Sequence, residues 1–257
     1  MGAVISWVNA LERSGAVMSA TSEAGGLGVR SVLSPTIAEV WRSNEGGAAT
    51  HRIEIDLAAH LPLRLFAFAA PRDGVRPGAG ATWRVRVSNG SMGASEALNS
   101  GVLQADGPTG TAAYLGPAGV TGRYVQFSFY GVAGDPYWQI GRLWAGDTLL
   151  VESGIAMGWQ RGAVDTGSSE RSPLSGVRNT QRGAVARRLD FSFPRLTPAE
   201  AEALDQIALD VGTTGQAFVS PFDGNKPAMF GRFTSPPDPA QVRHQRFSAR
   251  ITFEEDL

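Results

Sequence analysis

The sequence predicts a mainly β protein of two domains, with one α-helix in the second. The chain has 257 residues, of which 42% are hydrophobic and 18% charged, so it can bury a sizeable core. Its 32 glycines and 15 prolines punctuate short segments in which apolar residues alternate with polar ones, as in half-buried strands. A single segment near residue 200 has helical spacing instead. We place the domains at residues 1–150 and 151–257.

Alternating segments dominate the first domain. The clearest is Thr82–Ser88, in which Trp83, Val85 and Val87 share one face, before a turn at Asn89. The segments predicted as strands are Thr50–Leu57, Leu63–Ala69, Thr82–Ser88, Arg123–Phe129 and Trp138–Trp144. Short strands joined by glycine, proline and aspartate turns predict a β-sandwich or jelly roll.

Two segments rich in small and polar residues predict long loops. The first covers residues 90–119 and includes one short strand near Ala112–Leu115. The second covers residues 165–182 and has almost no large apolar side chains. Loops of this length are usually functional or mobile, and in assemblies they often become ordered on contact with a neighbour.

The second domain contains the predicted helix, at residues 198–211. Thr197, Pro198 and Glu200 form a capping box with proline at the first helical position, and Gly212 ends the helix. The apolar residues Leu204, Ile207, Ala208 and Val211 lie on one face. The strands predicted around the helix are Val185–Phe193, Gln216–Ser220, Ala228–Thr234 and Val242–Phe253. We expect the helix to pack on this sheet and leave Val185–Phe193 and Val242–Phe253 free at edges.

Composition excludes several classes of function. Cysteine is absent, which removes disulfides, thiolate metal sites and cysteine nucleophiles, and the three histidines are too scattered for a zinc motif. We therefore expect no cofactor and no metal. A net charge of −1 gives no polycation for nucleic acid. No apolar run is long enough to span a membrane, and without a recognisable signal peptide the chain is expected to be made in the cytoplasm.

Catalytic patterns are also absent, so we expect no enzyme activity. The sequence contains no GxSxG nucleophile elbow, and Glu54 and Asp56 share the outward face of a strand, which favours solvated carboxylates. The glycines of residues 25–28 lack the lysine of a phosphate-binding loop. Residues 223–226 lack the ligand pattern of a calcium loop and predict a hairpin turn.

Arginine and tryptophan supply the candidate binding residues. Lys226 is the only lysine among 23 basic residues, a bias that fits either a GC-rich genome or a protein–protein interface. The candidate interface residues are Trp159, Arg161, Arg171, Arg178 and Arg182. Trp83 is expected in the core, whereas Trp41 and Arg42, ahead of a polar loop, are candidate glycan contacts.

Two resemblances bear on identity. Trp41-Arg42-Ser43 followed by His51–Leu57 and Leu63–Ala69, with the later Arg123–Phe127, resembles the galactose-binding, or discoidin-like, jelly roll over residues 30–150. Tyr137–Gly146, then Gly158–Gly167, then a strand, a helix and a final acidic strand, is similar to distal or minor tail-tip proteins of long-tailed bacteriophages. In those proteins the second region is a ring-forming, tail-tube-like β domain, which here would follow the galactose-binding-like domain instead of preceding it.

These resemblances imply a structural component of a phage tail tip or baseplate, located in the virion. It would form a homo-oligomeric ring between the tube protein and the baseplate hub, with a hexamer favoured and a trimer as the alternative. The alternative is a carbohydrate-binding module that attaches the particle to a host-surface polysaccharide. In the structural hypothesis, the polar segment of residues 158–182 is an arm that reaches a neighbouring subunit.

Overall fold

The computed structural model describes residues 2–105, 110–171, 173–222 and 228–256. The chain divides into two compact units: residues 1–154 with 216–230, and residues 155–215 with 231–257. The first boundary between the units follows Gly154, four residues after the predicted boundary at residue 150. The prediction did not include the return of residues 216–230 to the first unit, which places the second division inside strand β19 (Met229–Phe233).

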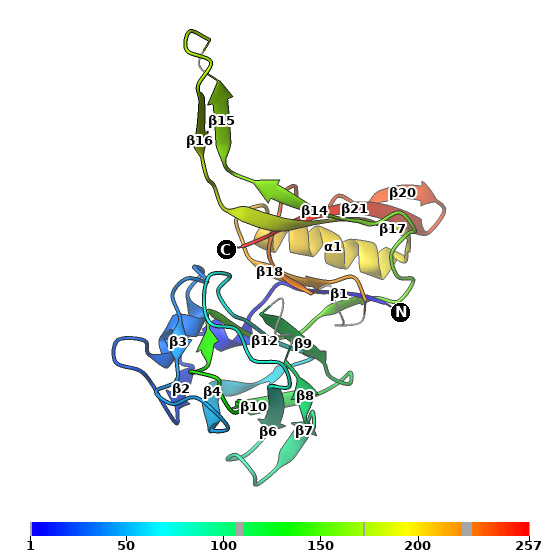
Figure 1. The fold of residues 1–257 in the computed structure, drawn as a ribbon. Coiled ribbons are helices and arrows are strands. Elements are labelled where there is room, and N and C mark those ends of the chain that lie inside the picture. The colour runs from blue at the N-terminus through cyan, green and yellow to red at the C-terminus, as the bar shows by residue number, and fades with distance from the viewer. Residues whose placement is uncertain (1, 106–109, 172, 223–227, 257) are drawn as a thin grey trace. The chain divides into compact units, whose positions relative to one another are not determined.

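Two packed sheets form most of the first unit (Figure 1). One contains β2 (Val17–Ala20), β4 (Thr50–Pro62), β10 (Thr121–Tyr130), β6 (Thr82–Ser88) and β7 (Glu96–Asn99), with β8 (Leu103–Gln104) also paired to β6. The other contains β12 (Arg142–Gly146), β5 (Leu65–Ala69) and β9 (Thr111–Leu115). Side chains from both sheets share one core, so the predicted β-sandwich is present. Trp83 lies in that core, as predicted.

The three-stranded sheet is buried on both faces, which explains the continuous apolar run of β5. Phe66 and Phe68 point into the sandwich core, whereas Leu65 and Ala67 belong to a second core. That second core is completed by side chains from β1 (Ala3–Ser6), β12, β18 (Ala217–Ser220) and the start of β19. β1 pairs with both β13 (Leu149–Val151) and β18, so residues distant in sequence meet along the N-terminal strand.

The predicted strand Trp138–Trp144 is in fact two strands. β11 (Gln139–Ile140) pairs with β3 (Trp41–Arg42), and β12 pairs with β5, with Gly141 between them. A Cβ on Gly141 would lie 2.0 Å from the carbonyl oxygen of Ile37, so only glycine fits at this close approach. The two tryptophans therefore do not share a face: Trp138 lies in the sandwich core and Trp144 in the second core.

In the second unit, helix α1 (Pro198–Val211) packs on β17 and β21 of a β-sheet (Figure 1). The unit's strands are β14 (Gln160–Asp165), β17 (Val185–Leu196), β20 (Ala240–Arg243), β21 (Arg246–Glu255), the end of β19, and the separate pair β15 (Ser168–Arg171) and β16 (Arg178–Gln181). The helix bounds, its capping box and the burial of Leu204, Ile207 and Val211 are confirmed. Ala208 is only partly buried, and Ala201 is the further buried residue. Two short 3-10 helices, Ala10–Glu12 and Val29–Leu33, lie in the first unit.

The predicted free edges of this sheet were wrong. β17 pairs with β14 on one side and β21 on the other, and β21 pairs with β17, β19 and β20. The predicted strand 242–253 is also not continuous. It turns between β20 and β21, where Gln245 has φ of 53°, so Arg243 and Gln245 do not extend the buried face of β21.

Both predicted loops contain strands. Residues 90–119 form β7, β8 and β9, of which only the last was expected. Residues 165–182 contain the hairpin of β15 and β16, which was predicted as irregular because its composition is polar on both faces. The turn predicted at residues 223–226 lies outside the described residues.

Candidate functional site

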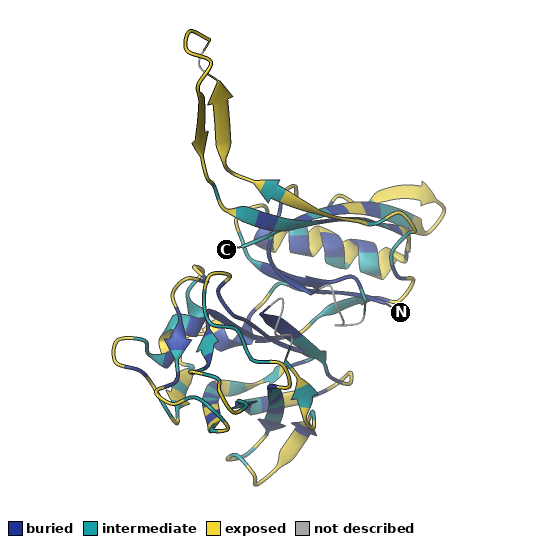
Figure 2. Ribbon diagram, viewed as in Figure 1, coloured by how far each residue is buried: buried dark blue, intermediate teal, exposed yellow. Residues whose placement is uncertain are grey.

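The hairpin of β15 and β16 projects from the second-unit sheet, and we call residues 166–184 the arm (Figure 1). All described residues between 165 and 182 are exposed, and Figure 2 shows strands β15 and β16 in the colour of exposed residues. β15 and β16 form a two-stranded sheet of their own. A hairpin of this kind is at best marginally stable in water without a surface to pack on.

The base of the arm is sharply defined. The amide of Thr166 donates to the carbonyl of Ala184 at 3.0 Å, directly after the last pair of the β14–β17 ladder. Gly167 and Gly183 then approach so closely that a Cβ on Gly183 would lie 2.1 Å from the Gly167 nitrogen. The two glycines therefore allow two chain segments to leave the sheet side by side.

The arm has basic side chains along its strands and apolar ones near its tip. Arg171 and Arg178 lie directly opposite each other, and each bonds within the arm: Arg171 Nε to the Gly176 carbonyl at 3.1 Å, Arg178 Nε to Ser169 Oγ at 2.7 Å. Like charges in directly opposed positions destabilise a strand pair. Leu174 and Val177 are 99% and 57% exposed. A partner surface with anionic and apolar groups would neutralise the opposed arginines and bury Leu174 and Val177.

Of the predicted interface residues, Arg171 and Arg178 therefore lie on the arm, and Arg182 is exposed just after β16. Arg161 lies on β14 and Trp159 directly before it instead, with the guanidinium of Arg161 over the Trp159 ring at 5.7 Å. The structure thus places these five residues in two groups, three on the arm and two on the sheet from which the arm extends.

A pocket of about 250 Å³ lies next to Trp159 on that sheet. Its lining residues are Met157, Gly158, Trp159, Gln160, Asp190, Phe191, Ser192 and Arg250. Sequence reasoning missed the polar members, although the alternation of β17 does place Asp190 and Ser192 on the face opposite the buried Leu189 and Phe191. What the strand pattern could not show is that β14 and β21 bring Gln160 and Arg250 beside them.

Asp190 is the fixed charged group of this pocket. Arg188 Nε donates to its Oδ2 at 2.8 Å, and the Thr252 hydroxyl donates to its Oδ1 at 2.6 Å. Partial burial opposes ionisation, but these donors outweigh it and lower the pKa of Asp190. The carboxylate is therefore charged and held in place at neutral pH.

The candidate glycan contact Trp41 is a core residue. Its side chain is 0% exposed, packs against Phe129 with ring centroids 6.2 Å apart, and donates from Nε1 to the Ser22 carbonyl at 3.0 Å. A ring in this position cannot stack on a sugar. Arg42 is only half-buried, and its guanidinium lies 4.8 Å from the centre of the Tyr137 ring at the loop end of the sandwich. His51 is buried beside Trp41, and burial lowers its pKa more than Glu45 raises it.

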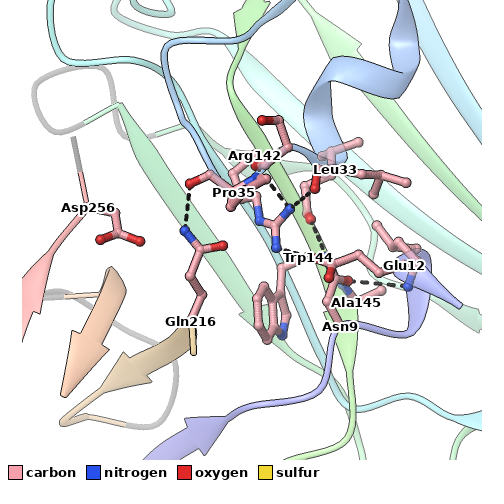
Figure 3. Close-up of polar contacts among 12 residues, drawn as sticks. Asn9, Glu12, Leu33, Pro35, Arg142, Trp144, Ala145, Gln216 and Asp256 are labelled. Carbon is pink, nitrogen blue, oxygen red and sulfur yellow. Dashed lines mark hydrogen bonds and ion pairs between the residues drawn. The ribbon is translucent and has the colours of Figure 1, made fainter. Parts of the chain in front are cut away.

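Other buried polar groups of the first unit hold strands together. Figure 3 shows Arg142 of β12, whose Nη1 donates to the Ser34 carbonyl at 3.2 Å and whose Nη2 pairs with Glu12. Asn9 donates to the Leu143 carbonyl at 3.0 Å and accepts from the Ala145 amide at 3.2 Å. Arg142 and Asn9 thus hydrogen-bond to groups within the fold, as buried polar side chains usually do.

The outward carboxylates of β4 are paired rather than solvated. Arg123 donates to both oxygens of Asp56, at 2.7 and 2.8 Å, and Gln126 Nε2 donates to Glu54 at 2.6 Å. The hydrogen bond from Arg123 lowers the pKa of Asp56 to about 2. Within the described residues, no group of three or more histidines and carboxylates could hold a metal ion, and no helix is long and apolar enough to cross a membrane.

No known protein family matches the sequence, and the curated proteins contain no match. Solved structures do. The family 32 carbohydrate-binding module from C. perfringens NanJ, in complex with galactose, is 13% identical with a TM-score of 0.45, over 55% of this chain and 98% of that chain. The lectin binding domain of Lectinolysin, in a mutant form complexed with Lewis b, is 13% identical with a TM-score of 0.43. That match covers 55% of this chain and 96% of the Lectinolysin domain. A Ruminococcus gnavus fucosidase in complex with fucose is 16% identical with a TM-score of 0.46. That match covers 55% of this chain and 27% of the fucosidase chain.

The chain is a mainly β protein by its own strands, and the solved structures similar to part of it include family 32 carbohydrate-binding modules. The sugars in those complexes belong to the neighbours themselves. The two candidate sites of the second unit are the arm and the pocket beside it.

Proposed function

We propose that this chain is a non-enzymatic structural subunit that joins other copies of itself through the arm. The observation that carries the proposal is the exposure of every described residue from 166 to 182, together with opposed Arg171 and Arg178 and an apolar tip at Leu174 and Val177. Such a hairpin lacks the packing that stabilises strands in water, and a neighbouring subunit would supply it.

The assembly we propose is a closed ring. In this proposal the arm docks on a different part of the neighbouring subunit, so that the contact repeats head to tail and closes on itself. The setting in a phage tail tip, with a hexamer favoured over a trimer and with tube protein and hub as neighbours, is supported by the sequence resemblance at residues 137–167. Its location in the virion follows from the same resemblance.

The test removes the arm without disturbing the sheet. Deleting Ser168–Arg182 joins Gly167 directly to Gly183, and because Thr166 and Ala184 are already hydrogen-bonded, the result is a two-residue Gly-Gly hairpin turn. We expect the shortened protein to remain folded by circular dichroism but to be monomeric by native mass spectrometry. The intact chain should form oligomers under the same conditions.

A matched pair of variants separates the arm from general charge effects. Changing Arg171, Arg178 and Arg182 to glutamine should weaken association, whereas the same change at Arg13, Arg243 and Arg246, which are exposed elsewhere, should not. An intact chain that stays monomeric at high concentration, or an arm-deleted chain that still forms the same oligomer, contradicts the proposal.

Glycan binding by the first unit is the second candidate. It is supported by Arg42 and Tyr137, a half-exposed cation and aromatic ring in contact at the loop end of the sandwich. Tyr137→Ala should abolish retention on a polysaccharide column, with Tyr130→Ala, at the end of β10, as the control. Retention unchanged by Tyr137→Ala contradicts this second candidate.

A further inference from the structure

The outer face of the second-unit sheet gathers polar side chains from three strands. The register pairs Gln160 of β14 with Asp190 of β17, and Ser192 of β17 with Arg250 of β21. Paired residues point to the same side of a sheet, so these four side chains form one continuous polar floor. The intervening Phe191 is buried, consistent with a face turned the other way, toward α1.

The residues before β14 add a wall to this floor. Met157 is fully exposed and Trp159 is half-buried, and both line the pocket of about 250 Å³. The amide of Ala156 donates to the Ser192 carbonyl at 2.8 Å, which fixes this segment to β17. Pockets for drug-sized ligands usually measure about 300–1,000 Å³, so this one is suited to a single ring.

The charged groups of the pocket indicate what kind of ring it can bind. Asp190 is ionised and anchored by Arg188 and Thr252, and an Arg250 nitrogen lies 4.0 Å from its Oδ1. The carboxylate disfavours an anionic ligand, and the two guanidinium groups disfavour a cationic one. Carboxylate, guanidinium, amide and hydroxyl together both donate and accept hydrogen bonds. These groups match a neutral ligand rich in hydroxyls.

We propose that this pocket binds one neutral hexose ring. Asp190 would accept hydrogen bonds from its hydroxyls, and Gln160 and Arg250 would donate to them. Trp159 would contact the apolar C–H face of the ring, because an indole offers a large flat apolar surface. The site lies wholly in the second unit, so it is distinct from the Arg42–Tyr137 contact, and it does not depend on assembly through the arm.

The test uses the full chain and the methyl glycosides of glucose, galactose and mannose. Saturation-transfer difference NMR should show signals from the ring protons of at least one of them. A titration with the sugar that binds should give a Kd on the order of 1 mM, as expected for a ligand of this size. Absence of binding by all three sugars at tens of times this concentration (roughly 50 mM) would overturn the proposal.

Variants locate the binding. Gln160→Ala and Arg250→Ala remove exposed side chains, so the fold should persist, and each should weaken binding by about tenfold, the loss of one good hydrogen bond. Trp159→Ala should weaken it further. Arg243→Ala, on the neighbouring β20, and deletion of Ser168–Arg182 should leave the Kd unchanged. Binding that survives both Gln160→Ala and Arg250→Ala, or that is lost in Tyr137→Ala, would overturn the assignment.

Discussion

At the scale of single residues, the ion pair between Asp56 and Arg123 shows how the first unit uses its surface charges. The pair joins neighbouring strands β4 and β10 through two hydrogen bonds. Its side chains are 29% and 39% exposed, so solvent screens the interaction and its contribution to stability is small.

The pH dependence of this contribution has a definite sign. The folded-state pKa of Asp56, about 2, lies below the ordinary value of 3.8, so the pair stabilises the fold above about pH 4 and is lost as the pH falls toward 2. The difference in unfolding midpoint between the natural chain and Asp56→Asn should therefore shrink between pH 6 and pH 2. Asp73→Asn, which removes an exposed loop carboxylate, controls for charge alone. A difference that stays constant over this range would rule out the pair as its source.

Gly141 is a second residue whose role is specific. Because a Cβ there would lie 2.0 Å from the Ile37 carbonyl oxygen, Gly141→Ala must displace backbone between β11 and β12. We expect a loss of more than about 2 kcal/mol in the free energy of unfolding, measured by urea denaturation. Gly162→Ala, on β14, where a Cβ would meet nothing within 4 Å, is the control and should be close to neutral. Equal effects at both positions would contradict this account.

At the scale of the element, α1 gives a comparison within one helix. Leu204 is 0% exposed and Leu209 is 81% exposed. Leu204→Ala should cost about 2–5 kcal/mol of unfolding free energy, because it removes buried contacts and leaves a cavity, whereas Leu209→Ala should change it by less than about 0.5 kcal/mol. Chemical denaturation followed by circular dichroism measures both. Similar values for the two variants would mean that α1 does not pack through this face.

The arm is the element that depends least on its own unit. Its strands lack a hydrophobic face, and its opposed arginines repel each other, so we expect its amides to exchange with solvent faster than those of β17. On assembly the same amides should become protected. Equal exchange rates for the amides of the arm and of β17 would contradict this account.

At the scale of the whole molecule, the first unit needs residues from late in the chain. β18 pairs with β1, and Phe218 and Phe230 pack with Leu65 and Trp144 in the second core. A fragment of residues 1–154 lacks both phenylalanines and leaves one edge of β1 unpaired. We expect it to melt well below the intact chain and to bind the dye ANS.

Adding residues 216–233 back through a glycine-serine linker should raise the melting temperature of this fragment and reduce its ANS fluorescence. A fragment of residues 1–154 that already melts like the intact chain would show that the second core is dispensable.

Local signals in the sequence determined those elements whose residues all point to the same structure. The capping box at Thr197 and the spacing of Leu204, Ile207 and Val211 predicted α1 to the residue, and alternation predicted β6. Both signals come from a segment's own period and caps, which do not depend on its neighbours. The polar composition of residues 165–182 likewise predicted that this segment does not pack internally.

Tertiary structure alone decided which segments meet. The backbone of Ile37 lies so close to Gly141 that the predicted strand breaks there. Residues of β4 and β10 bury Trp41. Strand β17 is flanked by β14, which precedes the arm, and by β21, which follows it. The pocket beside Trp159 depends in the same way on register between β14, β17 and β21. Pairing and close approach are properties of two segments at once, and a period read along one segment carries no information about its partner. The sequence therefore predicted the elements, while the fold decided their contacts and the site.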